Sequence, residues 1–193
     1  MTASSSVIGL LLAAGAGRRM GRPKALVENW LVDSVTVLRD GGCNRVLVVL
    51  GAAADQASRL LVGHDVDIVV AEDWDEGMGA SLRTGLAALG EAGDAAVAAT
   101  LVSLVDLPDV GSDVVRRLLD RPVTAATLAR ASYAGTPGHP VLIGREHWAG
   151  VIESATGDRG ARTYIATHDV VLVECGDLAT GHDVDRGGTL SEP

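Results

Sequence analysis

Residues 7–24 read VIGLLLAAGAGRRMGRPK, and this stretch decides the fold. A short apolar run stops at small and glycine residues, and four cations follow within seven positions. Such a run is typical of a buried strand, and glycines let backbone N–H groups approach an anion because they accept positive φ angles. In a chain with a net charge of −9, the stretch therefore predicts a strand that ends in an anion-binding loop.

Downstream of this loop, short apolar runs alternate with longer helical patterns. Strands are predicted at Val7–Leu12, Arg45–Leu50, Val66–Ala71, Ala98–Val105, Val123–Ala131, Val141–Gly144 and Val170–Glu174. Helices are predicted at Leu31–Asp40, Ala53–Leu61, Ala80–Leu89, Ser112–Leu119, Arg145–Ser154 and Gly160–Thr167, with Gly41 and Gly42 as a helix stop and Ser112 as a helix cap. This alternation predicts an α/β fold with three layers, a mostly parallel Rossmann-like sheet and helices on both faces.

The segment from Thr124 to Gly144 breaks the alternation. It reads as two strands joined by AGTPGHP (residues 134–140), with no helix between them. A short antiparallel segment is therefore expected there. No linker or repeat interrupts the chain, so residues 1–193 are expected to form a single domain.

Composition excludes several classes of protein. Hydrophobic residues make up 47% and charged residues 21% of the 193 positions, which is ordinary for a globular protein. The net charge of −9 argues against binding to nucleic acid or to an anionic membrane. No apolar run approaches the ~20 residues that cross a bilayer. Cys43 and Cys175 are too few for a disulfide framework or a zinc cluster, and a reducing cytoplasm is the simplest setting.

The first loop departs from the two best-known nucleotide-binding loops. Pro23 and Ala25 flank Lys24, so the P-loop pattern fails. Gly15, Gly17 and Gly21 have one residue too many for a dinucleotide fingerprint, so NAD or FAD binding is disfavoured but stays open. Lys24 is the only lysine of the chain, which favours a position that needs a compact ammonium, as phosphate coordination does.

Asp106 follows a long predicted strand and precedes Leu107-Pro108-Asp109. A carboxylate at the end of a strand, opposite a cationic phosphate loop, favours a bridging Mg²⁺, which commonly takes one or two carboxylates plus phosphate oxygens. The alternative is that Asp106 forms a turn or caps a helix. Both interpretations stay open on the residues alone.

Residues 11–24, LLAAGAGRRMGRPK, closely resemble the signature of MobA-like nucleotidyltransferases. Four further stretches extend the resemblance: GMGASLRTGL from Gly77, LVDLPDV from Leu104, GHPVL from Gly138 and GDRGAR from Gly157. With a closing DVD at 183–185, the resemblance spans residues 7–185. Within the superfamily, the chain looks most like the molybdenum cofactor cytidylyltransferases.

The resemblance implies a role for each matching residue. Lys24, Arg19 and Asp106 would be catalytic, and Mg²⁺ would be held by Asp106 and Asp185. The implied nucleotide-binding residues are Leu12, Ala13, Ala14, Gly15, Gly17, Arg18 and Ser81. The implied acceptor-binding residues are His139, Asp158, Arg159 and Arg162; helical spacing would place Arg159 and Arg162 on one face.

Three stretches depart from the family pattern. KALVENWLVDSV lacks the usual turn after the lysine segment, DLP stands where this branch often has Asp-Gln-Pro, and RGGTL follows the closing DVD. The last departure puts the metal role of Asp185 in doubt.

The expected reaction is transfer of CMP from CTP to the terminal phosphate of molybdopterin cofactor, with release of pyrophosphate. A molybdenum hydroxylase would then receive the product. Three alternatives stay open: a guanylyltransferase that uses GTP, an NAD(P)-dependent oxidoreductase on a related scaffold, and a nucleotide-binding chaperone that delivers the cofactor.

Overall fold

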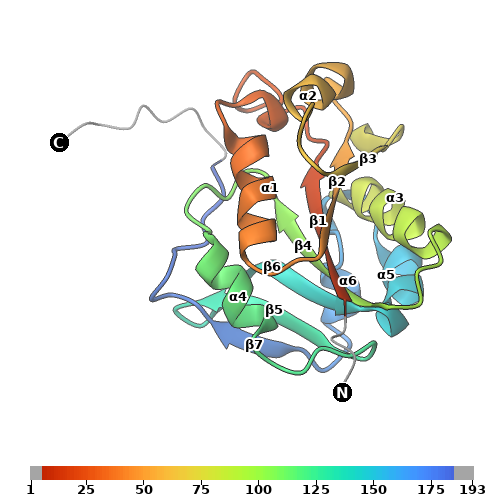
Figure 1. Ribbon diagram of the computed structural model, residues 1–193, viewed down its shortest axis with the longest axis vertical. Coiled ribbons are helices and arrows are strands. Elements are labelled where there is room, and N and C mark those ends of the chain that lie inside the picture. The colour runs from red at the N-terminus through yellow and green to blue at the C-terminus, as the bar shows by residue number, and fades with distance from the viewer. Residues whose placement is uncertain (1–5, 185–193) are drawn as a thin grey trace.

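A seven-stranded sheet with the order β3-β2-β1-β4-β6-β5-β7 runs through the molecule (Figure 1). The structure, a computed structural model, describes residues 6–184. The strands are β1 (Ser6–Ala13), β2 (Arg45–Leu50), β3 (Asp67–Val70), β4 (Val97–Leu104), β5 (Leu128–Tyr133), β6 (Thr136–Gly144) and β7 (Val171–Glu174). Strands β1 to β4 are parallel, β6 is antiparallel to both of its neighbours, and β7 is parallel to β5. The predicted mostly parallel sheet with a short antiparallel segment is confirmed.

Within the described residues, six α-helices cover the two faces of the sheet (Figure 1). They are α1 (Trp30–Asp40), α2 (Ala54–Leu60), α3 (Met78–Glu91), α4 (Ser112–Leu119), α5 (Trp148–Ser154) and α6 (Arg162–Ile165). Helices α1, α2 and α4 pack into one apolar core, and α3, α5 and α6 pack into the other. Residues 7–13 of β1 are all buried, as expected for a strand that helices cover on both faces. None of the helices in residues 6–184 is long and apolar enough to cross a membrane.

Strand β1 lies where the strand order reverses. It pairs with β2 on one side, in the register Leu12↔Val49, and with β4 on the other, in the register Leu12↔Leu104. The loops that follow β1 and β4 therefore leave the same edge of the sheet next to each other. Open α/β sheets bind ligands at such a point.

Four local predictions are wrong. Strand β5 begins at Leu128 instead of Val123 and ends at Tyr133 instead of Ala131. The N-cap of α4 is Gly111, because Ser112 is already the first helical residue and makes no capping hydrogen bond. Strand β6 begins at Thr136 instead of Val141, so TPGHP is a strand segment and the turn is confined to Ala134 and Gly135. Arg159 and Arg162 do not share a helix, because Gly160 has φ 51° and ψ −131° and separates a 3-10 turn from α6.

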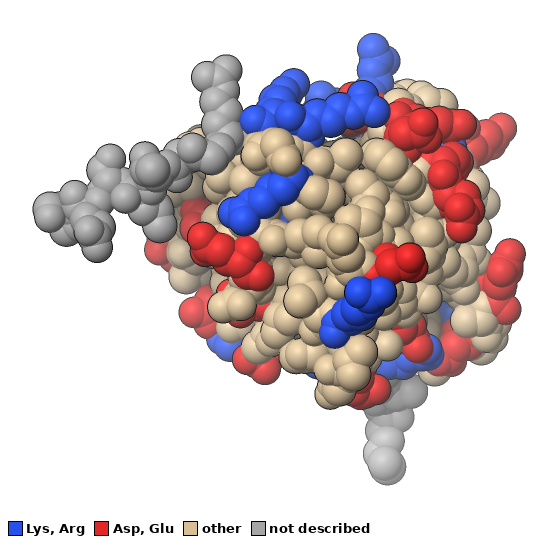
Figure 2. Space-filling view, turned by 90° about the horizontal axis from the view of Figure 1, so that it is seen from above, with Lys and Arg blue, Asp and Glu red and all other residues tan. Residues whose placement is uncertain are grey.

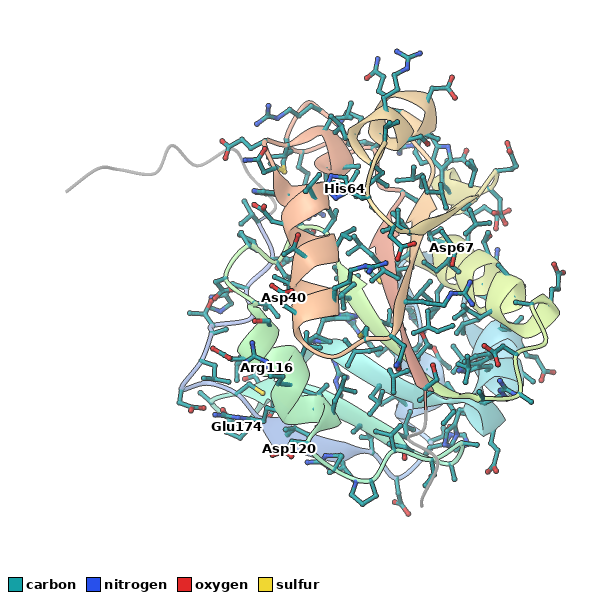
Figure 3. The ribbon with its side chains drawn as sticks, in the orientation of Figure 1. Asp40, His64, Asp67, Arg116, Asp120 and Glu174 are labelled. Carbon is teal, nitrogen blue, oxygen red and sulfur yellow. The ribbon has the colours of Figure 1, made fainter. Side chains whose placement is uncertain are left out.

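Helices α1 and α4 meet where α1 ends, as Figure 3 shows for Asp40 and Arg116. The Nε of Arg116 donates to the carbonyl oxygen of Asp40 at 3.3 Å. The next residue, Gly41, has φ −75°, which suits any residue. A Cβ there would nevertheless lie 2.3 Å from the Cβ of Val115. Gly41 is therefore required by the close approach of the two helices and not by its backbone angles.

We expect Gly41→Ala to lower the free energy of unfolding by about 1–3 kcal/mol, because the helices must separate to admit the methyl group. Gly90→Ala is the matched control: Gly90 lies in α3, where an added Cβ meets nothing within 4 Å. The control should gain up to about 1 kcal/mol from helix propensity. Urea unfolding measures both, and equal behaviour of the two variants would contradict the packing argument.

Candidate functional site

A cavity of about 380 Å³ opens between the loops that follow β1 and β4. Its walls come from both loops, from the segment that leads into α3, and from the 3-10 turn Gly157–Arg159. The lining residues are Leu12, Ala14, Gly15, Ala16, Arg18, Lys24, Trp74, Asp75, Glu76, Gly77, Met78, Ser81, Leu104, Val105, Asp106 and Asp158. Its size lies in the range of small-molecule sites.

The loop after β1 folds back on itself and carries Lys24 to the cavity. Gly17 has φ 58°, and a Cβ there would lie 1.8 Å from the carbonyl oxygen of Arg22, so no other residue fits. The amide of Met20 donates to Gly17 at 2.8 Å, and the amide of Lys24 donates to Gly15 at 3.4 Å. The glycines thus shape a tight turn that returns the chain to its starting point, where Lys24 enters the cavity.

Lys24 and Asp106 form an ion pair inside the cavity, between Nζ and Oδ2. Their side chains are only 19% and 10% exposed, so the two opposite charges compensate each other in a largely buried position. The backbone of Asp106 also meets the C-terminal segment, because the amide of Val184 donates to the Asp106 carbonyl oxygen at 3.0 Å. Asp185, the predicted second metal ligand, lies outside the described residues.

Most of the predicted nucleotide-binding residues line this cavity. Ala13 and Gly17 do not, and neither does Arg19, which was predicted to be catalytic. Ala13 is the last residue of β1, and its side chain packs into the core on the α1 side of the sheet. Gly17 forms the tight turn of the loop. Arg19 is exposed in the same loop and does not line the cavity. For Ala13 the alternation of a strand is the reason, because Leu12 and Ala13 must face opposite ways.

The wall opposite the basic loop is acidic. Asp75, Glu76 and Asp158 line the cavity across from Arg18 and Lys24. Figure 2 shows the edge at which β1 and β4 end, with basic side chains gathered on one part of it and acidic side chains on a neighbouring part. One end of a bound molecule would therefore meet cations and the other end carboxylates.

Arg83 of α3 holds this acidic wall in place. Its Nη2 donates to Asp73 at 3.1 Å and to Glu76 at 2.9 Å, and its Nη1 donates to the carbonyl oxygen of Ala155 at 2.7 Å. One guanidinium therefore joins α3 to two loops that line the cavity. Sequence analysis missed Arg83, although it stands two residues after Ser81 within the quoted GMGASLRTGL stretch.

The predicted acceptor-binding residues divide into two groups. Asp158 lines the cavity, whereas Arg159 is exposed in the adjoining turn and does not. His139 and Arg162 lie beside each other and beside Arg130, a residue that the sequence analysis missed. Burial and then the charges of Arg130 and Arg162 lower the pKa of His139 to about 4. Arg130 could have been noticed as a lone cation between the buried Ala129 and Ala131 of β5.

The donors at the cavity fit a divalent cation that arrives with its ligand. Within residues 6–184, no three His, Cys, Asp or Glu side chains cluster as a metal site. Among the described residues that line the cavity, Asp106 is the carboxylate that pairs with Lys24 of the loop after β1. Mg²⁺ is commonly held by one or two carboxylates with substrate phosphates and water as the remaining ligands, so this sparse donor set suits it.

These features define an α/β protein with a cavity beside a glycine-rich basic loop, at the reversal of its strand order. The chain belongs to the family described as the MobA-like NTP transferase domain, which it matches over residues 9–171.

Known proteins similar to the chain carry different names. Nicotine blue oxidoreductase of Paenarthrobacter nicotinovorans is 37% identical, over 93% of this chain and 92% of that protein. Rv0371c from Mycobacterium tuberculosis H37Rv is 26% identical with a TM-score of 0.78 over 95% of each chain, and another of its structures is a complex with manganese. A nucleotidyl transferase from Methanothermobacter thermautotroptrophicus has a TM-score of 0.78 at 20% identity, over 95% of this chain and 93% of that one, and so supports the fold alone.

We expect Arg83→Met to loosen the acidic wall and to lower the free energy of unfolding by about 1–2 kcal/mol, because three hydrogen bonds from a partly buried guanidinium are lost. Hydrogen exchange of the amides in residues 73–77 and 155–158 should speed up. Arg45→Met is the control, since it removes a half-exposed ion pair with Asp67 in the sheet and should cost less than about 1 kcal/mol. Unchanged exchange in Arg83→Met would show that something else holds the wall.

Proposed function

We propose that this protein is a metal-dependent nucleotidyltransferase that moves a nucleoside monophosphate from its triphosphate to a phosphate-bearing acceptor. The observation that carries the proposal is the meeting of Lys24 and Asp106, 82 residues apart, at one point under a glycine-rich loop. The loop offers backbone N–H groups, the lysine offers a positive charge, and the carboxylate offers a metal ligand. Metal-assisted phosphoryl chemistry needs these three groups together.

Each residue of the site has a task in this reaction. The backbone from Ala14 to Gly17, with Arg18 and Arg19, would bind the triphosphate, and Leu12 and Ser81 would contact the base and ribose. Lys24 would offset the charge that develops on the departing pyrophosphate. A divalent cation, when bound, polarises the phosphoryl oxygens, and Asp106 would hold it. Asp185 is proposed as its second ligand, because the neighbouring Val184 is hydrogen bonded to Asp106.

No covalent intermediate is required of the protein. Its contribution is to align the acceptor phosphate with the α-phosphate and to exclude water from the cavity. CTP as donor and molybdopterin as acceptor are the preferred substrates, on the strength of the resemblance in the GHPVL and GDRGAR stretches. A molybdenum hydroxylase is the proposed recipient of the product.

An oxidoreductase is the second candidate, and the 37% identity to nicotine blue oxidoreductase favours it. A nicotinamide dinucleotide carries a diphosphate that the same loop could bind. Such a ligand gives Asp106 no metal to hold, however, and a carboxylate beside a diphosphate is repulsive unless Lys24 stays paired with it. The two candidates therefore differ in whether ligand binding needs a divalent cation.

We expect Lys24→Met and Asp106→Asn each to lower turnover by about 10²- to 10³-fold, the usual cost of one preorganised electrostatic contact. Release of pyrophosphate from CTP with Mg²⁺ and molybdopterin measures this. Each single change removes one partner of a largely buried ion pair. The double variant therefore serves as a folding check and should unfold at a higher temperature than either single variant. Arg45→Met, which breaks an ion pair away from the cavity, should keep its turnover. Wild-type turnover in either cavity variant would refute the proposal.

We expect CTP with Mg²⁺ to raise the melting temperature by roughly 5–10 °C at about 100 times the dissociation constant. CTP without metal should give a much smaller shift, and so should GTP or ATP. A stabilisation by NADH or NADPH that needs no metal, in place of the CTP shift, would favour the oxidoreductase. Asp106→Asn should abolish the dependence on metal.

A further inference from the structure

Residues 176–184 follow β7 and lead past α4 to the loop that follows β4 (Figure 1). They form no helix or strand, so no regular ladder of backbone hydrogen bonds fixes their path. We call these residues the return segment. Its contacts with the rest of the protein fall into two sets, one near β7 and one at the functional cavity.

The first set of contacts holds the return segment near β7. The Nη2 of Arg117 in α4 donates to the Oδ2 of Asp177 at 2.9 Å, and its Nη1 donates to the carbonyl oxygen of Glu174 at 3.0 Å. Gly181 has φ 67°, and a Cβ there would lie 2.1 Å from the Cε2 of Tyr133. The segment therefore lies directly against the buried ring of Tyr133.

The second set of contacts joins the return segment to the loop after β4. The amide of Thr180 donates to the Oδ2 of Asp109 at 2.6 Å, and the hydroxyl of Thr180 donates to the same oxygen. The Thr180 hydroxyl also accepts from the amide of His182 at 3.4 Å. The amide of Val184 donates to the carbonyl oxygen of Asp106 at 3.0 Å. The two segments therefore run side by side in opposite directions.

The loop after β4 has its own anchors in the core. Leu107 and Val110 are buried, and the amide of Val110 donates to the carbonyl oxygen of Leu107 at 3.2 Å. Burial of these side chains fixes where the loop lies. The return segment adds the hydrogen bond to the carbonyl group of Asp106, the residue whose carboxylate is paired with Lys24. It therefore supports the backbone that carries this carboxylate.

We propose that Asp109 and Thr180 are positioning residues, which fasten the return segment to the loop after β4 and thereby hold the Asp106 carboxylate against Lys24. One carboxylate oxygen fixes both the backbone and the side chain of Thr180, and hydrogen bonds to a charged acceptor are stronger than neutral ones. That Asp106 holds a metal ion rests on the proposed function. That its position depends on Asp109 does not.

The test uses Lys24 as its own reporter. Lys24 is the only lysine of the chain, so protein labelled with ¹⁵N-lysine gives one side-chain ammonium signal in NMR. In cold, mildly acidic buffer, the exchange of the ammonium protons with water is measured, and an ion-paired ammonium exchanges when the pair opens. Asp109→Ala should speed up this exchange about 10-fold, as expected for the loss of hydrogen bonds to a charged group.

Three matched variants separate positioning from other effects. Asp177→Ala removes a carboxylate of the same charge from the other set of contacts, and it should leave the exchange of Lys24 unchanged. Asp109→Asn removes the charge but keeps an oxygen that can accept both hydrogen bonds of Thr180, so it should restore most of the wild-type protection. Thr180→Val loses only the hydroxyl and should fall between the wild type and Asp109→Ala.

The outcomes decide the proposal as follows. Faster exchange in Asp109→Ala that Asp109→Asn largely restores and Asp177→Ala does not show supports the positioning role. Unchanged exchange in Asp109→Ala overturns it, and so does an equal increase in Asp109→Ala and Asp177→Ala. An Asp109→Asn variant that exchanges as fast as Asp109→Ala also overturns it, because charge would then matter instead of position. If Asp109→Ala fails to fold, Thr180→Val decides in its place.

In turnover, Asp109→Ala should raise the Mg²⁺ concentration that gives half-maximal activity about 10-fold and leave the KM for the acceptor unchanged. A role confined to folding would lower the amount of active enzyme and change neither value. Faster exchange of Lys24 with an unchanged Mg²⁺ requirement, or in a protein that transfers no nucleotide, contradicts the proposed function and leaves the positioning role standing. Normal transfer by Asp109→Ala with unchanged exchange contradicts the positioning role alone.

Discussion

The reversal of strand order at β1 is the constraint on which the rest of the structure depends. Strand β1 pairs in parallel with both β2 and β4. The chain therefore continues from β1 to β2 toward one edge of the sheet, and from β4 to β5 toward the other edge. No helix can then close over the gap between the two loops. The gap is lined by the residues that follow each strand. Lys24 and Asp106, which are 82 residues apart in the chain, meet there.

The ion pair between Lys24 and Asp106 fixes the positions of both side chains in the cavity. Breaking a fully buried pair by removing one partner costs about 3–5 kcal/mol, and the exposures of 19% and 10% place this pair close to that limit. A metal-bound triphosphate offers both partners a replacement: phosphate oxygens for the ammonium and a cation for the carboxylate. A ligand that brings only an anion, or only a cation, offers a replacement partner to one of the two residues but not to the other. The pair thus favours ligands that bring an anion and a cation at once.

Regular elements were predictable because burial acts on runs of residues. The bounds of β2 and α4 agree with prediction, and β1 and β4 differ from it by one residue at each end. The failures are local. TPGHP has the composition of a turn, and only its pairing with β5 makes it a strand. Gly160, with φ 51°, separates Arg159 from Arg162, although their spacing had predicted one shared helical face.

At the site, motif spacing located the residues that touch the cavity, but it did not find the side chains that act from outside. Arg83 has an unremarkable place in α3, and its three partners at 73, 76 and 155 come together only in the folded chain. Arg130 likewise acquires its neighbours through β5 and α6. Such residues are defined by long-range contacts, and a linear pattern does not show which contacts they will make.

The similarity to nicotine blue oxidoreductase shows what this scaffold leaves undetermined. A sheet, a glycine turn and a cationic loop of this kind suit phosphate groups whichever chemistry follows. The two reactions differ in their need for a metal ion. Hydride transfer needs no carboxylate beside the phosphates, whereas nucleotidyl transfer needs a carboxylate that holds a metal ion. A chain that retained the scaffold for hydride transfer alone would gain stability by replacing both Lys24 and Asp106 with apolar residues. This chain keeps the pair beside its glycine-rich basic loop, and the proposed metal-dependent transfer is the reaction that would use both residues.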